Sequence, residues 1–223
     1  MKKKEKALQI IISQGLLPLF FHSDPQLSLG IIQTLYKAGI RTLEYTNRGK
    51  EALENFTFLK KELSSSCPDM QLGIGTIKTA EEAALFIAAG ADYIVAPVVN
   101  PEVGEAAQRA GLLWIPGCMT PTEINLARQH NAVLIKIFPA DLLGPGYISQ
   151  IRDLFPGQLF IPTGGVELDA KNIETWFKSG VSAIGMGSRL ISHEILNSKA
   201  YDLLFSRAEL ALGIIKMVRK VEA

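Results

Sequence analysis

The chain has 223 residues, of which 48% are hydrophobic and 20% are charged, an ordinary composition for a globular protein with a substantial core. Its formal net charge is +1, so electrostatics give no reason to expect a nucleic-acid or anionic-membrane partner. The two cysteines, Cys67 and Cys118, lack metal-ligand spacing, and nothing suggests a disulfide framework.

The N-terminus combines a basic start with an apolar run, as a secretion signal does. However, Ser13, Gln14, Gly15 and Pro18 interrupt the apolar run, and no small-x-small cleavage site follows it. The run is also too short and too interrupted to span a bilayer. We therefore expect an amphipathic helix, then a first strand, in a cytoplasmic protein.

Apolar runs typical of strands recur along the chain, and a turn and a helix-like segment follow each one. The expected strands are 16–21, 41–46, 71–76, 92–97, 112–116, 133–139, 159–163 and 181–185. Several of the helical segments between them end in glycine, which suits a left-handed C-terminal cap. These glycines are Gly39, Gly90, Gly111 and Gly180.

Regular alternation of strands and helices, without a long linker, predicts an α/β fold with a parallel sheet. Eight such units indicate a (β/α)8 TIM barrel with an extra N-terminal helix, forming a single domain over residues 1–223. A doubly wound open sheet is the alternative. It is disfavoured because no GxGxxG follows the first strand and no Walker-type loop occurs in the chain.

A lone lysine, Lys136, lies within an apolar run, where an ammonium is costly unless it is paired or loses its proton. Successive strand residues point to opposite faces. Because Ile135 and Ile137 suit the helix-facing side, Lys136 is expected to point into the barrel. The same alternation in strand 41–46 sends Glu44 inward, so the two side chains should share one interior.

This pair predicts carbonyl chemistry. Desolvation favours the neutral form of an amine, which is the nucleophile needed for a Schiff base with a carbonyl substrate. An adjacent carboxylate can relay protons, so Lys136 and Glu44 are the candidate catalytic residues. The alternatives are a buried ion pair that only fills the barrel, an epimerase or synthase in which Lys136 is an electrostatic clamp, and a non-catalytic sugar-phosphate-binding barrel.

Two glycine-rich turns predict a phosphate site. They occupy 162–165 and 185–190, after the last two strands, where barrels usually bind phosphate. Glycine-rich turns that lead into helix N-termini present backbone N–H groups to an anion, although glycines that only form tight turns are the alternative. The candidate phosphate-binding residues are Thr163, Gly164, Gly165, Gly187 and Ser188.

Other residues at the strand ends suit substrate binding. Arg48 could hold a substrate carboxylate by a bidentate contact, and Thr76 could donate its hydroxyl. Pro97, which ends the fourth strand, and Phe138, which shares a face with Lys136, are expected to line the substrate pocket.

Metal and thiol chemistry are not expected. The histidines are scattered and form neither HxH nor HExxH, which argues against a zinc site. Cys118 has no histidine near it in sequence, so we interpret it as a packing residue.

An ordered set of motifs spans the predicted barrel. They are LEYTNR at 43–48, GIGT at 73–76, PG at 116–117 with TPTE at 120–123, KIFPA at 136–140 and PTGGV at 162–166. This set resembles the class I aldolases that cleave 2-keto-3-deoxy-6-phosphogluconate (KDPG) and 4-hydroxy-2-oxoglutarate (KHG). In that family the corresponding motifs are LEVTxR, GAGT and K-x-FPA.

The resemblance implies a homotrimeric barrel without metal or cofactor that cleaves KDPG to pyruvate and glyceraldehyde 3-phosphate. KHG, cleaved to pyruvate and glyoxylate, is a second candidate substrate, and a related aldolase for the galactonate epimer is the alternative. The resemblance also implies Lys136 as the Schiff-base lysine and Glu44 as the general acid/base. It places Arg48 and Thr76 on the pyruvyl carboxylate, and the glycine-rich turns with Ser188 on the phosphate.

Three positions depart from the common family pattern. The sequence APV at 96–98 replaces SPG, Gly49 replaces a small polar residue, and Asp141 replaces glutamate. None of these changes removes a catalytic group. Gly49 and the Pro97–Val98 pair are expected to bear on the preference for the aldehyde.

Overall fold

Strands and helices alternate along the chain as the apolar runs predict. The computed structural model describes residues 2–221, so the ends of the predicted domain, residue 1 and residues 222–223, lie outside it. In chain order the elements are α1 (Lys3–Gln14), β1 (Leu16–Phe20), α2 (Pro25–Lys37), β2 (Thr42–Thr46), α3 (Ala52–Ser66), β3 (Gln71–Gly75), α4 (Ala80–Ala88), β4 (Tyr93–Val95), α5 (Pro101–Arg109), β5 (Leu113–Ile115), β6 (Gly117–Cys118), α6 (Pro121–Gln129), β7 (Leu134–Ile137), α7 (Ala140–Ile151), the 3-10 helix η1 (Arg152–Leu154), β8 (Leu159–Pro162), α8 (Ala170–Lys178), β9 (Ile184–Met186), α9 (His193–Ser198) and α10 (Tyr201–Val221).

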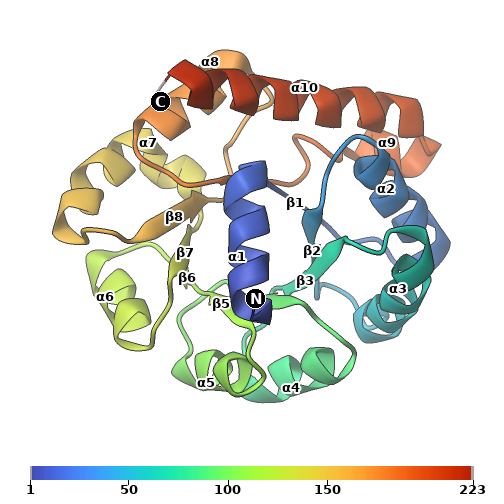
Figure 1. The fold of residues 1–223 in the computed structure, drawn as a ribbon, viewed down its shortest axis with the longest axis horizontal. Coiled ribbons are helices and arrows are strands. Elements are labelled where there is room, and N and C mark those ends of the chain that lie inside the picture. The colour runs from blue at the N-terminus through green and yellow to red at the C-terminus, as the bar shows by residue number, and fades with distance from the viewer. Residues whose placement is uncertain (1, 222–223) are drawn as a thin grey trace.

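The strands pair in parallel, in the orders β5-β4-β3-β2-β1-β9 and β6-β7-β8. The two sheets join because β5 and β6 continue one another across Pro116, whose carbonyl accepts a 2.9 Å hydrogen bond from the Lys136 N–H. At the other junction, Thr163 forms a parallel bridge to Gly185. The result is the predicted closed barrel, with helices around its strands (Figure 1).

All eight predicted strands are observed with at least one end shifted by one to three residues, and two of them also differ in continuity or position. The expected strand 112–116 is observed as β5 at Leu113–Ile115, and the chain resumes strand structure as β6 at Gly117–Cys118, after Pro116, which has no N–H to donate to the ladder. The expected strand 181–185 is observed later, as β9 at Ile184–Met186. The predicted glycine caps are confirmed: φ is positive at Gly39, Gly90, Gly111 and Gly180.

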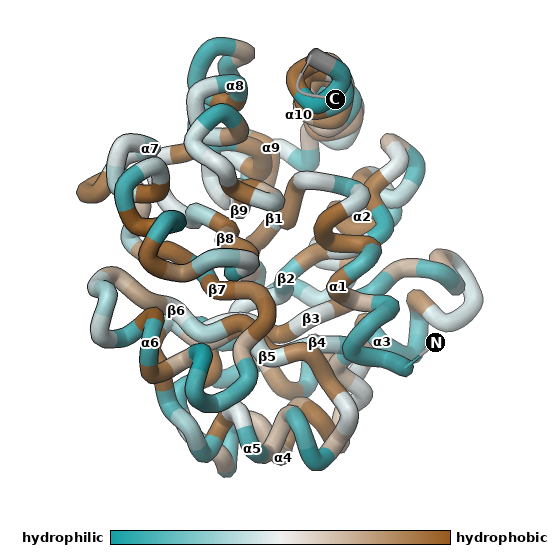
Figure 2. Tube along the Cα trace, turned by 60° about the vertical axis from the view of Figure 1, so that its left-hand side comes forward, coloured by the Kyte–Doolittle hydropathy of each residue, from teal (hydrophilic) through white to brown (hydrophobic). Residues whose placement is uncertain are grey.

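Alternation along the strands separates two apolar cores. The outer core lies between strands and helices and contains Leu43 and Tyr45 of β2 and Ile135 and Ile137 of β7. The inner core fills the barrel with Leu17, Tyr93, Val95, Leu113, Ile115, Leu134, Ile161 and Ala183. Figure 2 accordingly shows the hydrophobic colour on central strands such as β1 and β7, and the hydrophilic colour mostly on peripheral helices and turns.

Helix α1 covers one end of the barrel and is the predicted extra N-terminal helix. It lies across the centre of the ring in Figure 1. Ala7 and Ile11 are fully buried on its inner face and join the inner core. This packing covers the N-terminal end of the barrel with apolar side chains.

Helix α10 completes the ring of helices and packs against α2 and α8. Its buried face includes Leu204, Ala208 and Ala211, which belong to the outer core. None of the helices described between residues 2 and 221 is long and apolar enough to cross a membrane.

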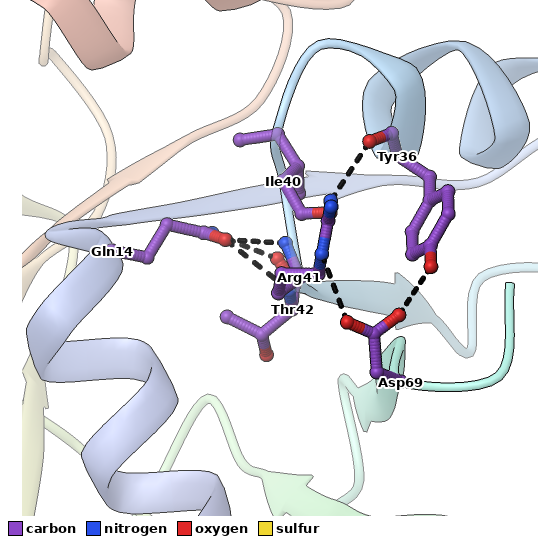
Figure 3. Close-up of polar contacts among 6 residues, drawn as sticks. All are labelled: Gln14, Tyr36, Ile40, Arg41, Thr42 and Asp69. Atoms are coloured by element: carbon purple, nitrogen blue, oxygen red, sulfur yellow. Dashed lines mark hydrogen bonds and ion pairs between the residues drawn. The ribbon is translucent and has the colours of Figure 1, made fainter.

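Gln14, the last residue of α1, fastens the helix to β2 (Figure 3). Its Oε1 accepts a 2.6 Å hydrogen bond from the Arg41 backbone N–H, and its Nε2 donates to the Thr42 carbonyl at 3.0 Å. Arg41 in turn lies 3.1 Å from the Asp69 carboxylate, which also accepts a hydrogen bond from the Tyr36 hydroxyl. The backbone at the start of β2 therefore depends on one side chain of α1.

We predict that Gln14→Ala lowers the free energy of unfolding by about 1–3 kcal/mol, because part-buried backbone groups at the start of β2 lose their partner. Urea denaturation measures this change. Gln9→Ala, at an exposed position on the same helix, is the matched control and should change the free energy by no more than about 0.5 kcal/mol. Equal effects of the two substitutions would contradict the role of Gln14.

Candidate active site

Lys136 of β7 and Glu44 of β2 meet inside the barrel. Lys136 Nζ lies 3.8 Å from Glu44 Oε1, and the two residues are 6% and 1% exposed. Both point inward because their strand neighbours, Ile135 and Ile137 on one side and Leu43 on the other, belong to the outer core. The structure therefore brings the two predicted catalytic side chains together.

The surroundings of this pair leave it chemically available. No group in the described chain donates a hydrogen bond to Glu44 Oε1. Lys136 Nζ also lies 5.1 Å from the centre of the Phe138 ring, whose face attracts a cation. The pair thus places an amine, the nucleophile that carbonyl addition needs, beside a carboxylate that can accept and return protons.

Gly75 of β3 makes room for the Glu44 side chain. A Cβ atom at Gly75 would lie 1.7 Å from Glu44 Oε1, so no other residue fits without displacing the carboxylate. Gly73 has the same relation to Tyr93, whose ring would lie 2.0 Å from a Cβ atom at Gly73. Sequence reasoning missed this role, although two alternating glycines within a strand are a known sign of close approach.

A cleft of about 970 Å³ opens above the pair, and the other predicted site residues line it. They are Arg48, Thr76, Pro97, Phe138, Thr163, Gly164, Gly165, Gly187 and Ser188. Lys136 also reaches the cleft, whereas Glu44 is buried beside it. A second hollow of about 680 Å³, between α1 and α10, contains none of these residues.

The residues predicted to hold a carboxylate lie at the ends of β2 and β3. Arg48 follows β2, and its exposed side chain lines the cleft. Thr76 follows β3 with a φ of 65°, a left-handed conformation that is uncommon for a β-branched residue and recurs at functional sites. The hydroxyl of Thr46, buried and without a hydrogen-bond partner among the described residues, is a further polar group at the end of β2 that the prediction omitted.

The β8 loop has a shape that requires glycine. Gly164 and Gly165 have φ values of 91° and 73°. A Cβ atom at Gly165 would lie 2.4 Å from that of Asp141, because the loop packs on the start of α7. Thr163 is 5% exposed, and its carbonyl accepts a 3.0 Å hydrogen bond from the Ala140 N–H.

Both glycine-rich loops join a strand to a helix, as expected, but neither runs directly into the helix N-terminus. Helix α8 begins at Ala170 and α9 at His193, several residues beyond the glycines. The side chains of Asp169 and Ser192 already cap the two helix N-termini. The glycines of both loops therefore lie several residues before the helix N-termini.

The departure at Gly49 has a steric reason. A Cβ atom there would lie 2.6 Å from Cζ of Phe21, which also lines the cleft. Phe21 packs on Tyr45 with ring centroids 5.5 Å apart. Phe21 therefore takes up the space beside Gly49 and leaves no room for a larger residue. Val98, by contrast, is exposed and does not line the cleft.

An ion pair joins the two loops at the mouth of the cleft. Arg189 Nε, after β9, lies 3.0 Å from Glu167 Oε1, after β8. Both residues line the cleft, as does Trp176, whose buried indole N–H has no hydrogen-bond partner within the described chain. Sequence reasoning did not identify this pair, because no local pattern relates two loops so distant in sequence.

Cys118 has the properties of a packing residue. It is 1% exposed in the short strand β6, and burial, with a smaller effect of Glu123, raises the pKa of its thiol to about 12. Burial also raises the pKa of Cys67. Neither thiol has the lowered pKa that a nucleophilic cysteine requires.

We predict that neither cysteine of the native protein reacts with a thiol reagent at about pH 8, because with a pKa of about 12 the thiolate fraction of Cys118 is about one part in 10⁴. Both cysteines should react rapidly in denaturant, which is the control for reagent activity. The number of thiols titrated over time measures this. Rapid modification of Cys118 in the native protein would contradict its assignment as a packing residue.

The chain is similar in sequence and in fold to known proteins. A family model described as KDPG and KHG aldolase matches residues 9–206. The chain is 36% identical over 140 residues to the 2-dehydro-3-deoxy-phosphogluconate aldolase of Treponema pallidum, a match that covers 62% of this chain and 65% of that protein. It is 30% identical over 167 residues to a probable 2-dehydro-3-deoxy-6-phosphogalactonate aldolase of Rhizobium meliloti. This match covers 74% of this chain and 76% of that protein.

The solved structures that are similar to this one include a KDPG aldolase from Legionella pneumophila with pyruvate captured at low pH as a covalent carbinolamine intermediate. It has a TM-score of 0.82 at 25% identity and covers 91% of this chain and 96% of that one. The family model spans most of the chain, and all the motifs that suggested the family, except PG at 116–117 with TPTE at 120–123, contribute residues to the lining of one cleft. The chain therefore belongs to the KDPG and KHG aldolase family.

Proposed function

We propose that the protein is a class I Schiff-base aldolase, a carbon–carbon lyase that cleaves KDPG to pyruvate and glyceraldehyde 3-phosphate. The observation that carries this proposal is the buried pair of Lys136 Nζ and Glu44 Oε1, 3.8 Å apart at the base of the cleft. Membership of the family and the carbinolamine captured in the Legionella enzyme support it.

Lys136 is the nucleophile in this mechanism. Its neutral amine adds to the keto carbon of the substrate, and the resulting carbinolamine loses water to give an iminium ion. Glu44 accepts a proton from the attacking amine and passes it to the carbinolamine oxygen, and a second proton, taken up from solvent, lets this hydroxyl leave as water. Phe138, which packs beside the amine, and Pro97 shield the reacting carbon from solvent.

The iminium ion then serves as the electron sink. A base removes the proton from the hydroxyl beside the bond to be broken, and Glu44 is the carboxylate in place to do so. The carbon–carbon bond breaks, its electrons enter the iminium as an enamine, and the aldehyde departs. Protonation of the enamine carbon and hydrolysis of the imine release pyruvate and restore Lys136. Every proton transfer uses groups of the chain or water.

Binding groups at the two ends of the cleft orient the substrate. Arg48 and Thr76, after β2 and β3, hold the pyruvyl carboxylate. The loops after β8 and β9 hold the phosphate at the opposite end. The phosphate-binding residues are Thr163, Gly164, Gly165, Gly187 and Ser188.

The range of substrates includes two further candidates. KHG has the same keto-acid end but lacks the phosphate, so it would use only the Lys136 end of the cleft. The galactonate epimer of KDPG is the alternative main substrate, since relatives with both specificities resemble the chain. Measured values of kcat/KM for KDPG, KHG and the galactonate epimer would rank the three aldols as substrates.

The proposal also covers the domain organisation, oligomeric state, cellular compartment and pathway of the enzyme. We infer a single barrel domain that acts in the cytoplasm as a homotrimer, in an Entner–Doudoroff type of sugar-acid breakdown. The trimer and the pathway rest on the family resemblance, and the compartment rests on the interrupted N-terminal run. Sedimentation velocity tests the trimer.

We predict that borohydride reduction in the presence of pyruvate places a stable pyruvyl adduct on Lys136, since reduction traps the imine. Peptide mass mapping locates the adduct. Lys136→Ala should abolish both adduct and turnover, whereas Lys50→Ala, at a highly exposed lysine, should change neither. Absence of an adduct on folded wild-type protein with excess pyruvate would overturn the Schiff-base mechanism.

We predict that Gly75→Ala lowers kcat by about 10²-fold or more, because the new Cβ atom displaces the carboxylate of Glu44 from the amine. Steady-state cleavage of KDPG measures the effect. Gly213→Ala on α10 is the control: apart from the adjacent residues and the backbone of its own helix, no atom of the described chain lies within 4 Å of its Cβ position, so activity should be unchanged. Full activity of Gly75→Ala would show that Glu44 is not needed at its observed position.

A further inference from the structure

Arg189 and Glu167 form an ion pair across the mouth of the cleft. Arg189 Nε lies 3.0 Å from Glu167 Oε1, and the side chains are 63% and 42% exposed. One residue follows β9 and the other follows β8, so the pair joins the two loops that we assign to the phosphate. Solvent exposure makes such a pair weak, and an incoming anion can replace one of its partners.

Arg189 is the cation available to the phosphate end of the cleft. The arginines and lysines among the described residues that line the cleft are Arg48, Lys136 and Arg189, and of these the two arginines stay positively charged at neutral pH. Arg48 and Lys136 are assigned to the carboxylate and the keto carbon. A phosphate between the β8 and β9 loops would therefore rely on Arg189 for charge compensation.

The backbone around Arg189 is anchored although its side chain is exposed. The Leu190 N–H donates a 2.9 Å hydrogen bond to the Gly187 carbonyl, which closes a turn. The Arg207 side chain donates to the carbonyls of both Arg189 and Leu190. Only rotation of the Arg189 side chain is needed to exchange one anionic partner for another, so the loop can keep its shape.

We propose that Arg189 is a specificity-determining residue that selects aldols ending in a phosphate, and that Glu167 holds its guanidinium at the mouth of the cleft until the phosphate displaces the carboxylate. A phosphate dianion offers more charge and more acceptor oxygens than a carboxylate, and guanidinium binds it bidentately, so the exchange favours phosphate. The proposal rests on the aldolase function proposed above and extends it to the choice of substrate.

A purely structural role of the Arg189–Glu167 ion pair predicts different effects of substituting its two residues. If the ion pair served only to fasten the two loops, loss of either partner would loosen the site in the same way. In the proposed exchange the partners act in opposite directions, because Arg189 binds the phosphate while Glu167 competes with it. The sign of the effect at Glu167 therefore separates the two roles.

The test compares Arg189→Gln and Glu167→Gln with a matched pair of controls, Arg109→Gln and Glu105→Gln. Arg109 and Glu105 form a similarly exposed ion pair on α5, 3.5 Å apart and outside the residues that line the cleft. Two quantities are measured. One is the dissociation constant of inorganic phosphate, by calorimetry, and the other is the ratio of kcat/KM for KDPG to that for KHG.

We expect Arg189→Gln to weaken phosphate binding about tenfold and to lower the kcat/KM ratio by a similar factor, the usual effect of losing a charged hydrogen bond. Glu167→Gln should tighten phosphate binding by about two- to fivefold, as a weak exposed competitor is removed. The controls should leave both quantities unchanged. Weaker phosphate binding in both variants, or unchanged binding in Arg189→Gln, would overturn the proposal.

Failure of this proposal is distinguishable from failure of the aldolase function. Phosphate binding is measured without turnover, so it reports on Arg189 even if no aldol is cleaved. A pyruvyl adduct on Lys136 together with unaltered phosphate binding in Arg189→Gln would remove only the role of Arg189. Lack of the adduct would remove the aldolase function.

Discussion

The pair formed by Lys136 and Glu44 is the constraint on which the interior of the barrel depends. Two ionisable groups that are 6% and 1% exposed are tolerated only because each is the partner of the other. Removing one partner from such a buried pair typically costs about 3–5 kcal/mol, since the remaining charge is left uncompensated. The barrel must therefore hold β2 and β7 in a fixed relation, and the same rigidity keeps the amine beside its proton acceptor for catalysis.

Packing around the pair follows from this requirement. Helix α1 and the inner apolar core cover the N-terminal end with apolar side chains, and the cleft opens above the pair. On the neighbouring strand, Gly75 leaves the space that the Glu44 carboxylate occupies. Tyr93 fills the matching space at Gly73 and donates a 2.7 Å hydrogen bond to the Leu43 carbonyl, beside Glu44 in the chain. The two glycines of β3 thus make room in the barrel interior for the larger side chains of Glu44 on β2 and Tyr93 on β4.

Sequence periodicity correctly predicted the features that depend on local backbone geometry, such as the face of a strand on which a side chain lies. Alternation along a strand was enough to send Lys136 and Glu44 to the same interior, and the chain order of strand ends gathered the other predicted residues around one cleft. Features set by distances between remote segments were not predictable in this way. The fit of Gly75 against Glu44, the contact of Phe21 with Gly49 and the Arg189–Glu167 pair each join residues that no local pattern relates. The break at Pro116 is intermediate, since proline marks it but only the strand pairing shows that the barrel continues through it.

The division between interior and loops suggests how substrate choice can change while the chemistry stays the same. The carbon–carbon cleavage that we propose needs the amine, the carboxylate and the binding of a keto acid, which are held by strands and their immediate ends. The far end of the cleft consists of loops whose side chains, such as Arg189 and Glu167, are largely exposed and make few demands on packing. A substitution there alters which anion or sugar is bound without disturbing the buried pair. For this reason we expect the departure from the family pattern at Gly49, which packs against Phe21 of the cleft, to bear on the choice of aldehyde and not on the formation of the Schiff base.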